Sequence, residues 1–142
     1  MSDESRVIKC ATFRWEGVPV IAYKPDPALY KDVTRQTIVG EGAGEEAGDI
    51  VTRYFEVQPG GYSTLERHAH CHTVIVLRGR GAVRLGERTH DIAPFDAVYV
   101  APHAVHQFRA TGAEPLGFVC VVQRERDRAV PVRDRIPGRD AG

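Results

Sequence analysis

The chain has 142 residues with 19 basic and 19 acidic side chains, which is enough for one domain with a substantial core. The charge balance lacks the basic excess of a nucleic-acid-binding surface, and no apolar stretch is long enough to span a membrane. The charged N-terminus does not resemble a signal peptide, so we expect a cytoplasmic protein. Three cysteines without a CxxC pair indicate neither a disulfide framework nor a zinc ribbon.

Short runs of strand-forming residues, separated by Gly, Pro and Asp turns, follow one another along almost the whole chain. The expected strands span 6–14, 18–23, 35–40, 50–58, 63–68, 73–77, 82–85, 88–92, 97–100, 106–110 and 116–123. Only residues 27–33 have the character of a short helical turn. Many short strands at regular spacing predict an all-β fold, either an antiparallel sandwich or a barrel.

Three parts of the chain are expected. Residues 1–34 contain N-terminal strands that pack on the barrel or on a dimer partner, and residues 35–123 form the barrel itself. Residues 124–142 form a charged C-terminal tail in which arginine alternates with acidic residues. Sequence this poor in apolar residues cannot bury enough surface to order itself, so we expect the tail to lie in solvent.

Three histidines alternate with other residues at His68, His70 and His72, and Glu66 precedes them at the same spacing. In an extended strand, residues two and four positions apart face the same way. Three imidazoles and a carboxylate make a poor apolar core, but neutral imidazole is the commonest protein ligand for transition metals. A solvated strand face is the alternative, and the apolar run that follows the cluster argues against it.

The segment around these histidines resembles the first motif of the cupin superfamily, in its small single-domain members. That motif runs Gly, five residues, His-x-His, three or four residues, Glu, six residues, Gly. Here Gly60 is followed by five residues, then by Glu66 and His68, three residues, His72, six residues and Gly79. The spacing fits without a gap, although Glu66 stands at the usual first histidine and His72 at the usual glutamate.

The second cupin motif has a Pro-x-Asp turn, a strand, a Pro turn and a histidine. Pro94, Asp96, Pro102 and His106 match it in this order. The resemblance implies a double-stranded β-helix, the cupin or jelly-roll barrel, which binds one divalent transition metal per subunit through three histidines and one glutamate. It also implies a homodimer in which the N-terminal strands pack across a two-fold axis. The metal can be Zn, Mn, Fe, Ni, Co or Cu, because mixed ligands suit several ions.

Two ligand sets remain open. The ungapped register gives Glu66, His68, His72 and His106, with a turn between the first two histidines of the set and His70 beside the site. The other register gives four histidines, His68, His70, His72 and His106. Whichever of Glu66 and His70 does not bind metal is the candidate catalytic general base.

Alternate side chains of a barrel strand point into the interior. The residues expected to line a substrate pocket on this basis are Arg53, Phe55, Val74, Val76 and Phe108. Arg53 would then be a charged anchor for a carboxylate or phosphate, unless it turns outward to a surface acid.

The resemblance therefore implies a metal-dependent enzyme that binds a small organic substrate through enol or carbonyl oxygens. It would be a dioxygenase, or an isomerase, lyase or cyclase. The alternative is a non-catalytic cupin module that holds a metal or a small molecule. In both cases the expected partner is a small molecule, with no nucleic acid and no membrane.

Overall fold

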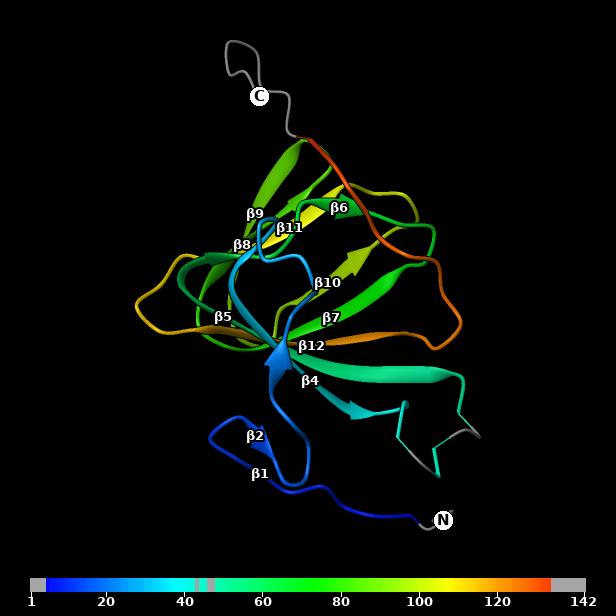
Figure 1. Ribbon diagram of the computed structural model, residues 1–142. Coiled ribbons are helices and arrows are strands. Elements are labelled where there is room, and N and C mark those ends of the chain that lie inside the picture. Colours follow the sequence, from blue (N-terminus) through cyan, green and yellow to red (C-terminus); the bar gives the residue numbers. More distant parts are fainter. Residues whose placement is uncertain (1–4, 43, 46–47, 134–142) are drawn as a thin grey trace.

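A computed structural model describes residues 5–42, 44–45 and 48–133. Within these ranges the chain is all β, as the spacing of turns predicts, and it forms the strands of a curled sheet (Figure 1). The strands are β1 (Cys10–Ala11), β2 (Arg14–Trp15), β3 (Ile21–Ala22), β4 (Lys31–Val39), β5 (Ile50–Tyr62), β6 (Glu66–Arg67), β7 (His72–Arg78), β8 (Gly81–Leu85), β9 (Arg88–Ile92), β10 (Ala97–Val100), β11 (His106–Ala110), β12 (Leu116–Gln123) and β13 (Val130–Pro131).

No helix that could cross a membrane occurs in the described ranges. The helical turn expected at 27–33 is also wrong. The side chain of Asp26 accepts a hydrogen bond from the backbone N–H of Ala28 at 3.0 Å, which closes a local turn. Lys31 already belongs to β4, where it pairs with Tyr62 of β5. Backbone pairing with the barrel therefore outweighs the weak helical tendency of the segment.

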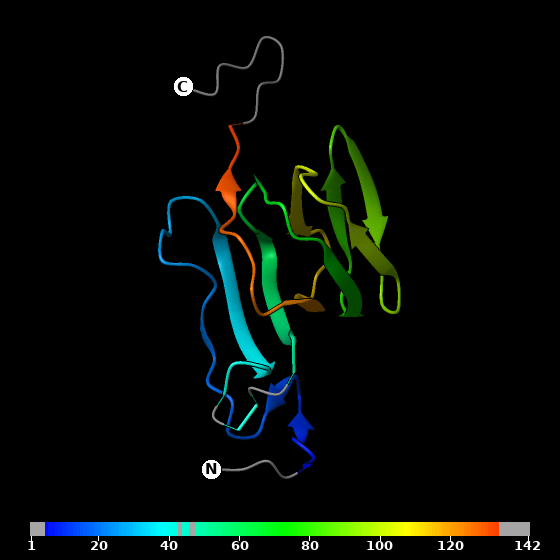
Figure 2. The same ribbon diagram turned by 90° about the vertical axis from the view of Figure 1, so that its right-hand side faces the viewer.

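One 11-stranded sheet runs in the order β10-β7-β12-β5-β11-β6-β13. In addition, β4 pairs with β5 and β3, and β8 pairs with β11 and β9, while β1 and β2 form a separate two-stranded sheet. Figure 2 views the curl from the side, with β4 at one margin and the β8–β9 hairpin at the other. Strand β5 belongs to both halves of the curl, since its first part pairs with β12 and its last residue, Tyr62, pairs with β11. A Cβ atom on Gly61 would lie 2.6 Å from the carbonyl oxygen of Lys31, so the bend in β5 requires glycine there.

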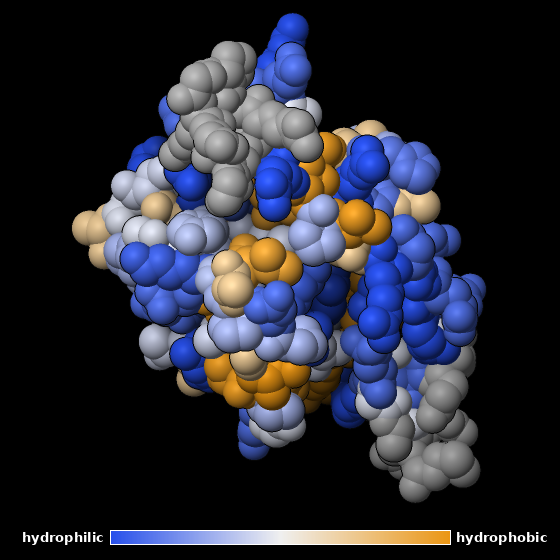
Figure 3. Space-filling model, turned by 45° about the horizontal axis from the view of Figure 1, so that its top comes forward, coloured by the Kyte–Doolittle hydropathy of each residue, from blue (hydrophilic) through white to orange (hydrophobic). Residues whose placement is uncertain are grey.

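The inward-facing side chains of β5, β7, β10, β11 and β12 form most of the apolar core, and β4, β8 and β9 contribute one residue each. Strand β7 shows the period of two clearly, because Val74 and Val76 are fully buried while Ile75 between them is exposed. Burying one such side chain stabilises the fold by about 1.5–3 kcal/mol. On the face of the molecule shown in Figure 3, apolar residues form small separate patches within a mostly hydrophilic surface.

The N-terminal region covers the outer face of β5. The expected strand at 6–14 is instead a hairpin of β1 and β2, because Thr12 and Phe13 both have positive φ angles and reverse the chain. The rings of Phe13 and Trp15 lie 6.0 and 4.9 Å from the ring of Tyr54, which is fully buried. This region therefore packs on the barrel of its own chain, and the homodimer stays a prediction.

The first part of the expected tail does not lie free in solvent. In residues 124–133, Asp127 accepts hydrogen bonds from the backbone N–H groups of Ala69 and His70 at 2.7 and 3.0 Å. Farther on, β13 pairs with β6 at the edge of the sheet. The sequence argument considered only apolar burial, whereas this segment is held by backbone pairing and by a charge-assisted contact. Residues 134–142 of the expected tail lie outside the described residues.

Candidate metal centre and pocket

Three histidines meet inside the barrel because three strand ends come together there. His68 follows β6, His72 begins β7 and His106 begins β11, which pairs with β6 so that His106 lies opposite Glu66. The chain bends at 69–70, so His68 and His72 face the same space. One nitrogen atom from each of the three rings lies within 4.8 Å of the others. The three side chains are buried, and together they form the histidine triad.

Backbone carbonyl groups orient two of the three rings. His68 Nδ1 lies 2.6 Å from the carbonyl oxygen of His70, and His106 Nδ1 lies 2.9 Å from that of Ala104. A carbonyl oxygen only accepts, so Nδ1 carries the proton in both rings and Nε2 keeps its lone pair for a metal. His68 Nε2 is buried and has no hydrogen-bond partner among the described residues. A metal ion would satisfy this atom, so the triad fits a metal.

Burial also keeps these rings neutral, which is the form that binds metal. Burial, followed by the nearby charge of His70, lowers the pKa of His68 to about 4. Burial is likewise the largest cause that lowers the pKa of His72, with the charge of His68 second. It also lowers the pKa of His106, although the Ala104 carbonyl and Glu66 oppose the shift. At neutral pH the triad therefore presents three uncharged imidazoles.

Both candidates for a fourth ligand border the triad. Glu66 Oε2 lies 3.8 Å from His106 Nε2 and 4.0 Å from His68 Nε2, while Oε1 pairs with Lys24. Glu66 is buried, so Lys24 compensates a carboxylate that water cannot reach easily. The turn that the ungapped register requires between His68 and His72 is present.

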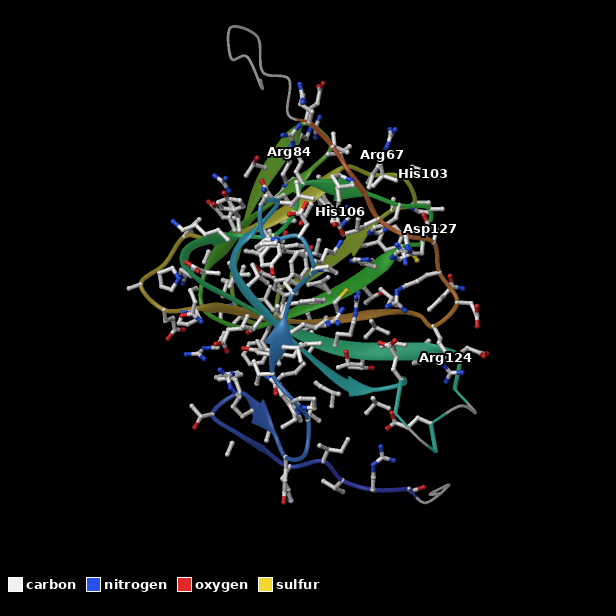
Figure 4. All side chains as sticks on the ribbon, in the orientation of Figure 1. Arg67, Arg84, His103, His106, Arg124 and Asp127 are labelled. Atoms are coloured by element: carbon white, nitrogen blue, oxygen red, sulfur yellow. The ribbon has the colours of Figure 1, made fainter. Side chains whose placement is uncertain are left out.

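His70 borders the triad from the other side. Its ring stacks on that of His68 with a centroid distance of 3.7 Å, and its Nε2 lies 3.2 Å from His72 Nε2. Its Nδ1 lies 2.7 Å from an oxygen of Asp127 in the C-terminal segment. Figure 4 labels Asp127 on this segment and His106 in the barrel interior. Since Glu66 and His70 both lie beside the triad, both ligand sets remain open.

A cavity of about 700 Å³ extends from the triad, a size that suits a small organic molecule. Arg53, Phe55 and Phe108 line it. Val74 and Val76 point inward but lie in the core and do not reach the cavity wall, so their assignment to the pocket needs correction. The alternation of side chains along a strand predicts which of them point inward, but not which of the inward-facing side chains reach the cavity.

Cys120 is one of several cavity residues that the sequence did not reveal, because it lies in the apolar run of β12, where a cysteine is typically a small core residue. It is indeed buried, but it also lines the cavity. Its Sγ lies 3.3 Å from His72 Nδ1 and accepts a hydrogen bond from Arg53 Nη2 at 3.4 Å. Burial raises the pKa of the thiol, and Arg53 opposes that shift. The only sequence signal was its inward position on β12, two residues after Phe118.

Known proteins agree with this architecture. Residues 53–122 match the family model of the cupin domain. The 1-methylthio-D-xylulose 5-phosphate methylsulfurylase of Rhodospirillum rubrum is 47% identical over 118 residues, which are 82% of this chain and 72% of that protein.

Two solved structures are similar over most of the chain. A cupin-2 domain from Rhodospirillum rubrum has a TM-score of 0.76 and 42% identity, covering 89% of this chain and 83% of that one. A cupin 2 conserved barrel domain protein from Rhodopseudomonas palustris has a TM-score of 0.79 and 44% identity, with 89% and 86% covered. The motifs, the curled all-β sheet and these similarities together establish that the chain belongs to the cupin superfamily, as a small barrel of the cupin-2 type.

Proposed function

We propose that the protein is a metal-dependent enzyme that binds a small ketose derivative through its carbonyl oxygen and cleaves a carbon–sulfur bond. The position of Cys120 carries this proposal, because its thiol lines the same cavity as the triad and lies 3.3 Å from His72 Nδ1. A thiol beside a metal site is the group needed to accept a methylthio group. The name of the relative with 47% identity, a methylsulfurylase, supports the same chemistry.

His68, His72 and His106 would hold a divalent transition metal, with Glu66 or His70 as the fourth ligand. When bound, the metal supplies Lewis-acid polarisation of a carbonyl group. Mn, Fe, Co, Ni, Cu and Zn all accept such ligands. If His72 binds through Nε2, its Nδ1 carries a proton and points at Cys120 Sγ. Two donors, His72 Nδ1 and Arg53 Nη2, then stabilise the thiolate of Cys120.

The proposed step starts when whichever of Glu66 and His70 is not a ligand takes the thiol proton. The thiolate attacks the sulfur of the methylthio group, so a sulfur–sulfur bond forms and the bond from sulfur to carbon 1 breaks. The electron pair of the broken bond stays on carbon 1, which becomes the end of an enolate. The stored proton returns to that carbon, leaving a methyl ketone and a methyl disulfide on Cys120. A low-molecular-weight thiol would then release the methylthio group by thiol–disulfide exchange.

Mass spectrometry of the intact protein tests this step directly. Protein loaded with Mn²⁺ is mixed with 1-methylthio-D-xylulose 5-phosphate in the absence of added thiol. We expect one methylthio group on Cys120 and one equivalent of the ketose phosphate that carries a methyl group in place of the methylthiomethyl group. Cys120→Ser should give neither. Cys10→Ser is the matched control, because Cys10 is exposed on β1, and it should react as the wild type does.

The other functions that the cupin motifs suggested give different results in the same experiment. Consumption of O₂ in proportion to substrate lost would indicate a dioxygenase, and a product isomeric with the substrate would indicate an isomerase. Tight metal binding without turnover of this ketose or of related carbonyl compounds would favour a non-catalytic binding module. Each of these results would contradict carbon–sulfur cleavage.

A further inference from the structure

Five arginines line the cavity, and three of them, from separate parts of the chain, affect one another through their charges. Arg35 comes from β4, Arg53 from β5 and Arg126 from the C-terminal segment. None of the three has a carboxylate within ion-pair distance among the residues that the structure describes. The cavity wall therefore gathers positive charge that the described part of the chain does not neutralise by direct pairing.

Arg53 is the most buried of the three, with only 8% of its surface exposed. One guanidinium nitrogen donates to Cys120 Sγ, and the group lies 4.9 Å from the ring centre of Phe55. Its Nε has no partner among the described residues, and neither does the buried Nε of Arg35. A buried charge with an unused donor is costly unless a ligand completes its hydrogen bonds.

The three guanidinium groups are close enough to affect one another. Burial first, and the charge of Arg53 second, lower the pKa of both Arg35 and Arg126. The carboxylate of Glu41 opposes both shifts, but it is exposed at the rim of the cavity. A bound anion would relieve this repulsion.

We propose that Arg35, Arg53 and Arg126 form a phosphate-binding subsite. A phosphate monoester carries a charge close to −2 and three acceptor oxygens, whereas a carboxylate carries −1 and two. The planar donors of arginine suit phosphate oxygens in particular. Three guanidinium groups therefore match a phosphate better than a carboxylate.

Cys120 connects the subsite to the triad, since its Sγ lies 3.4 Å from Arg53 Nη2 and 3.3 Å from His72 Nδ1. A short substrate can place its phosphate on the arginines, its carbonyl oxygen at the triad and a methylthio group at the thiol. This last assignment rests on the proposed function, whereas the binding of phosphate by the arginines does not.

Titration calorimetry with inorganic phosphate tests the subsite on metal-free protein, so that no metal can bind the anion. We expect saturable binding to the wild type, with acetate binding more weakly. Arg53→Met and Arg126→Met should each weaken phosphate binding by about tenfold, because each removes charge-assisted hydrogen bonds. Arg88→Met is the control, since Arg88 is exposed on β9 and does not line the cavity, and it should bind phosphate normally. Thermal unfolding checks that each variant is folded.

The result separates the subsite from the metal chemistry. Unchanged phosphate affinity in both Arg53→Met and Arg126→Met, no phosphate binding to the wild type, or acetate bound as tightly as phosphate would overturn the subsite. A parallel titration with Mn²⁺ should give the same affinity for Arg126→Met as for the wild type. If the wild type binds phosphate but binds no metal or forms no adduct on Cys120, the proposed function is refuted and the phosphate subsite stands.

Discussion

Removal of one histidine of the triad should abolish tight metal binding without unfolding the barrel. In His106→Ala the two remaining rings keep their positions, because His68 follows β6 and His72 begins β7. Zinc bound by four protein ligands is worth about 10–16 kcal/mol in small structural sites, or about 3 kcal/mol for each ligand. At 1.4 kcal/mol per tenfold change in affinity, the variant should bind metal about 100-fold more weakly.

Calorimetric titration of EDTA-treated protein with Zn²⁺ or Mn²⁺ measures this loss. His68→Ala and His72→Ala should behave in the same way, because all three residues belong to both ligand sets. His90→Ala is the control, since His90 is exposed on β9, and it should bind metal as the wild type does. Normal metal affinity in His106→Ala would refute the assignment of the triad.

The same titration separates the two ligand sets. If the site contains three histidines and a carboxylate, Glu66→Ala should lose metal affinity while His70→Ala keeps it. If the site contains four histidines, the pattern reverses. Similar losses of metal affinity in Glu66→Ala and His70→Ala would mean that neither four-ligand set describes the site.

Three further predictions rest on the geometry, and a fourth rests on the resemblance to small cupins. Folding lowers the pKa of His68 from 6.5 to about 4, so the unfolded chain binds more protons than the folded protein between these two pH values. The stability of the metal-free protein should therefore fall as the pH drops from 6.5 to 4. Urea unfolding across this pH range measures the change. Asp127→Ala should speed hydrogen exchange at the backbone N–H groups of Ala69 and His70, because it removes their acceptor; unchanged exchange would show that the segment does not depend on this contact. Gly79→Ala should destabilise the fold by about 3 kcal/mol or more, because the φ of Gly79 is 73° and a Cβ would lie 2.1 Å from the carbonyl oxygen of Pro115. Gly86→Ala is the control, since Gly86 has a φ of 64° but open space around it, and it should cost about 1 kcal/mol. Urea unfolding measures both changes. Light scattering at micromolar concentration should give the mass of a homodimer, and a monomer would count against the resemblance in quaternary structure.

Much of the barrel could be predicted from the sequence, because local rules decide it. Turn residues at regular spacing separate runs that can only be strands, and the period of two assigns Val74 and Val76 to the inner face. The spacing of the two motifs also gave the triad of His68, His72 and His106, which the structure brings within 4.8 Å. These features depend on neighbours along the chain or on a motif whose strands meet in a known way.

Only the tertiary structure decided what else reaches the cavity. Cys120, Arg35 and Arg126 meet there through the register between β4, β5 and β12 and through the path of the C-terminal segment, none of which leaves a local pattern. The composition likewise predicted that the segment beginning at Arg124 lies in solvent, because apolar content takes account of hydrophobic burial alone. Asp127 holds that segment through backbone N–H groups at 69–70, and such a long-range polar contact becomes visible only when both partners have been placed in space.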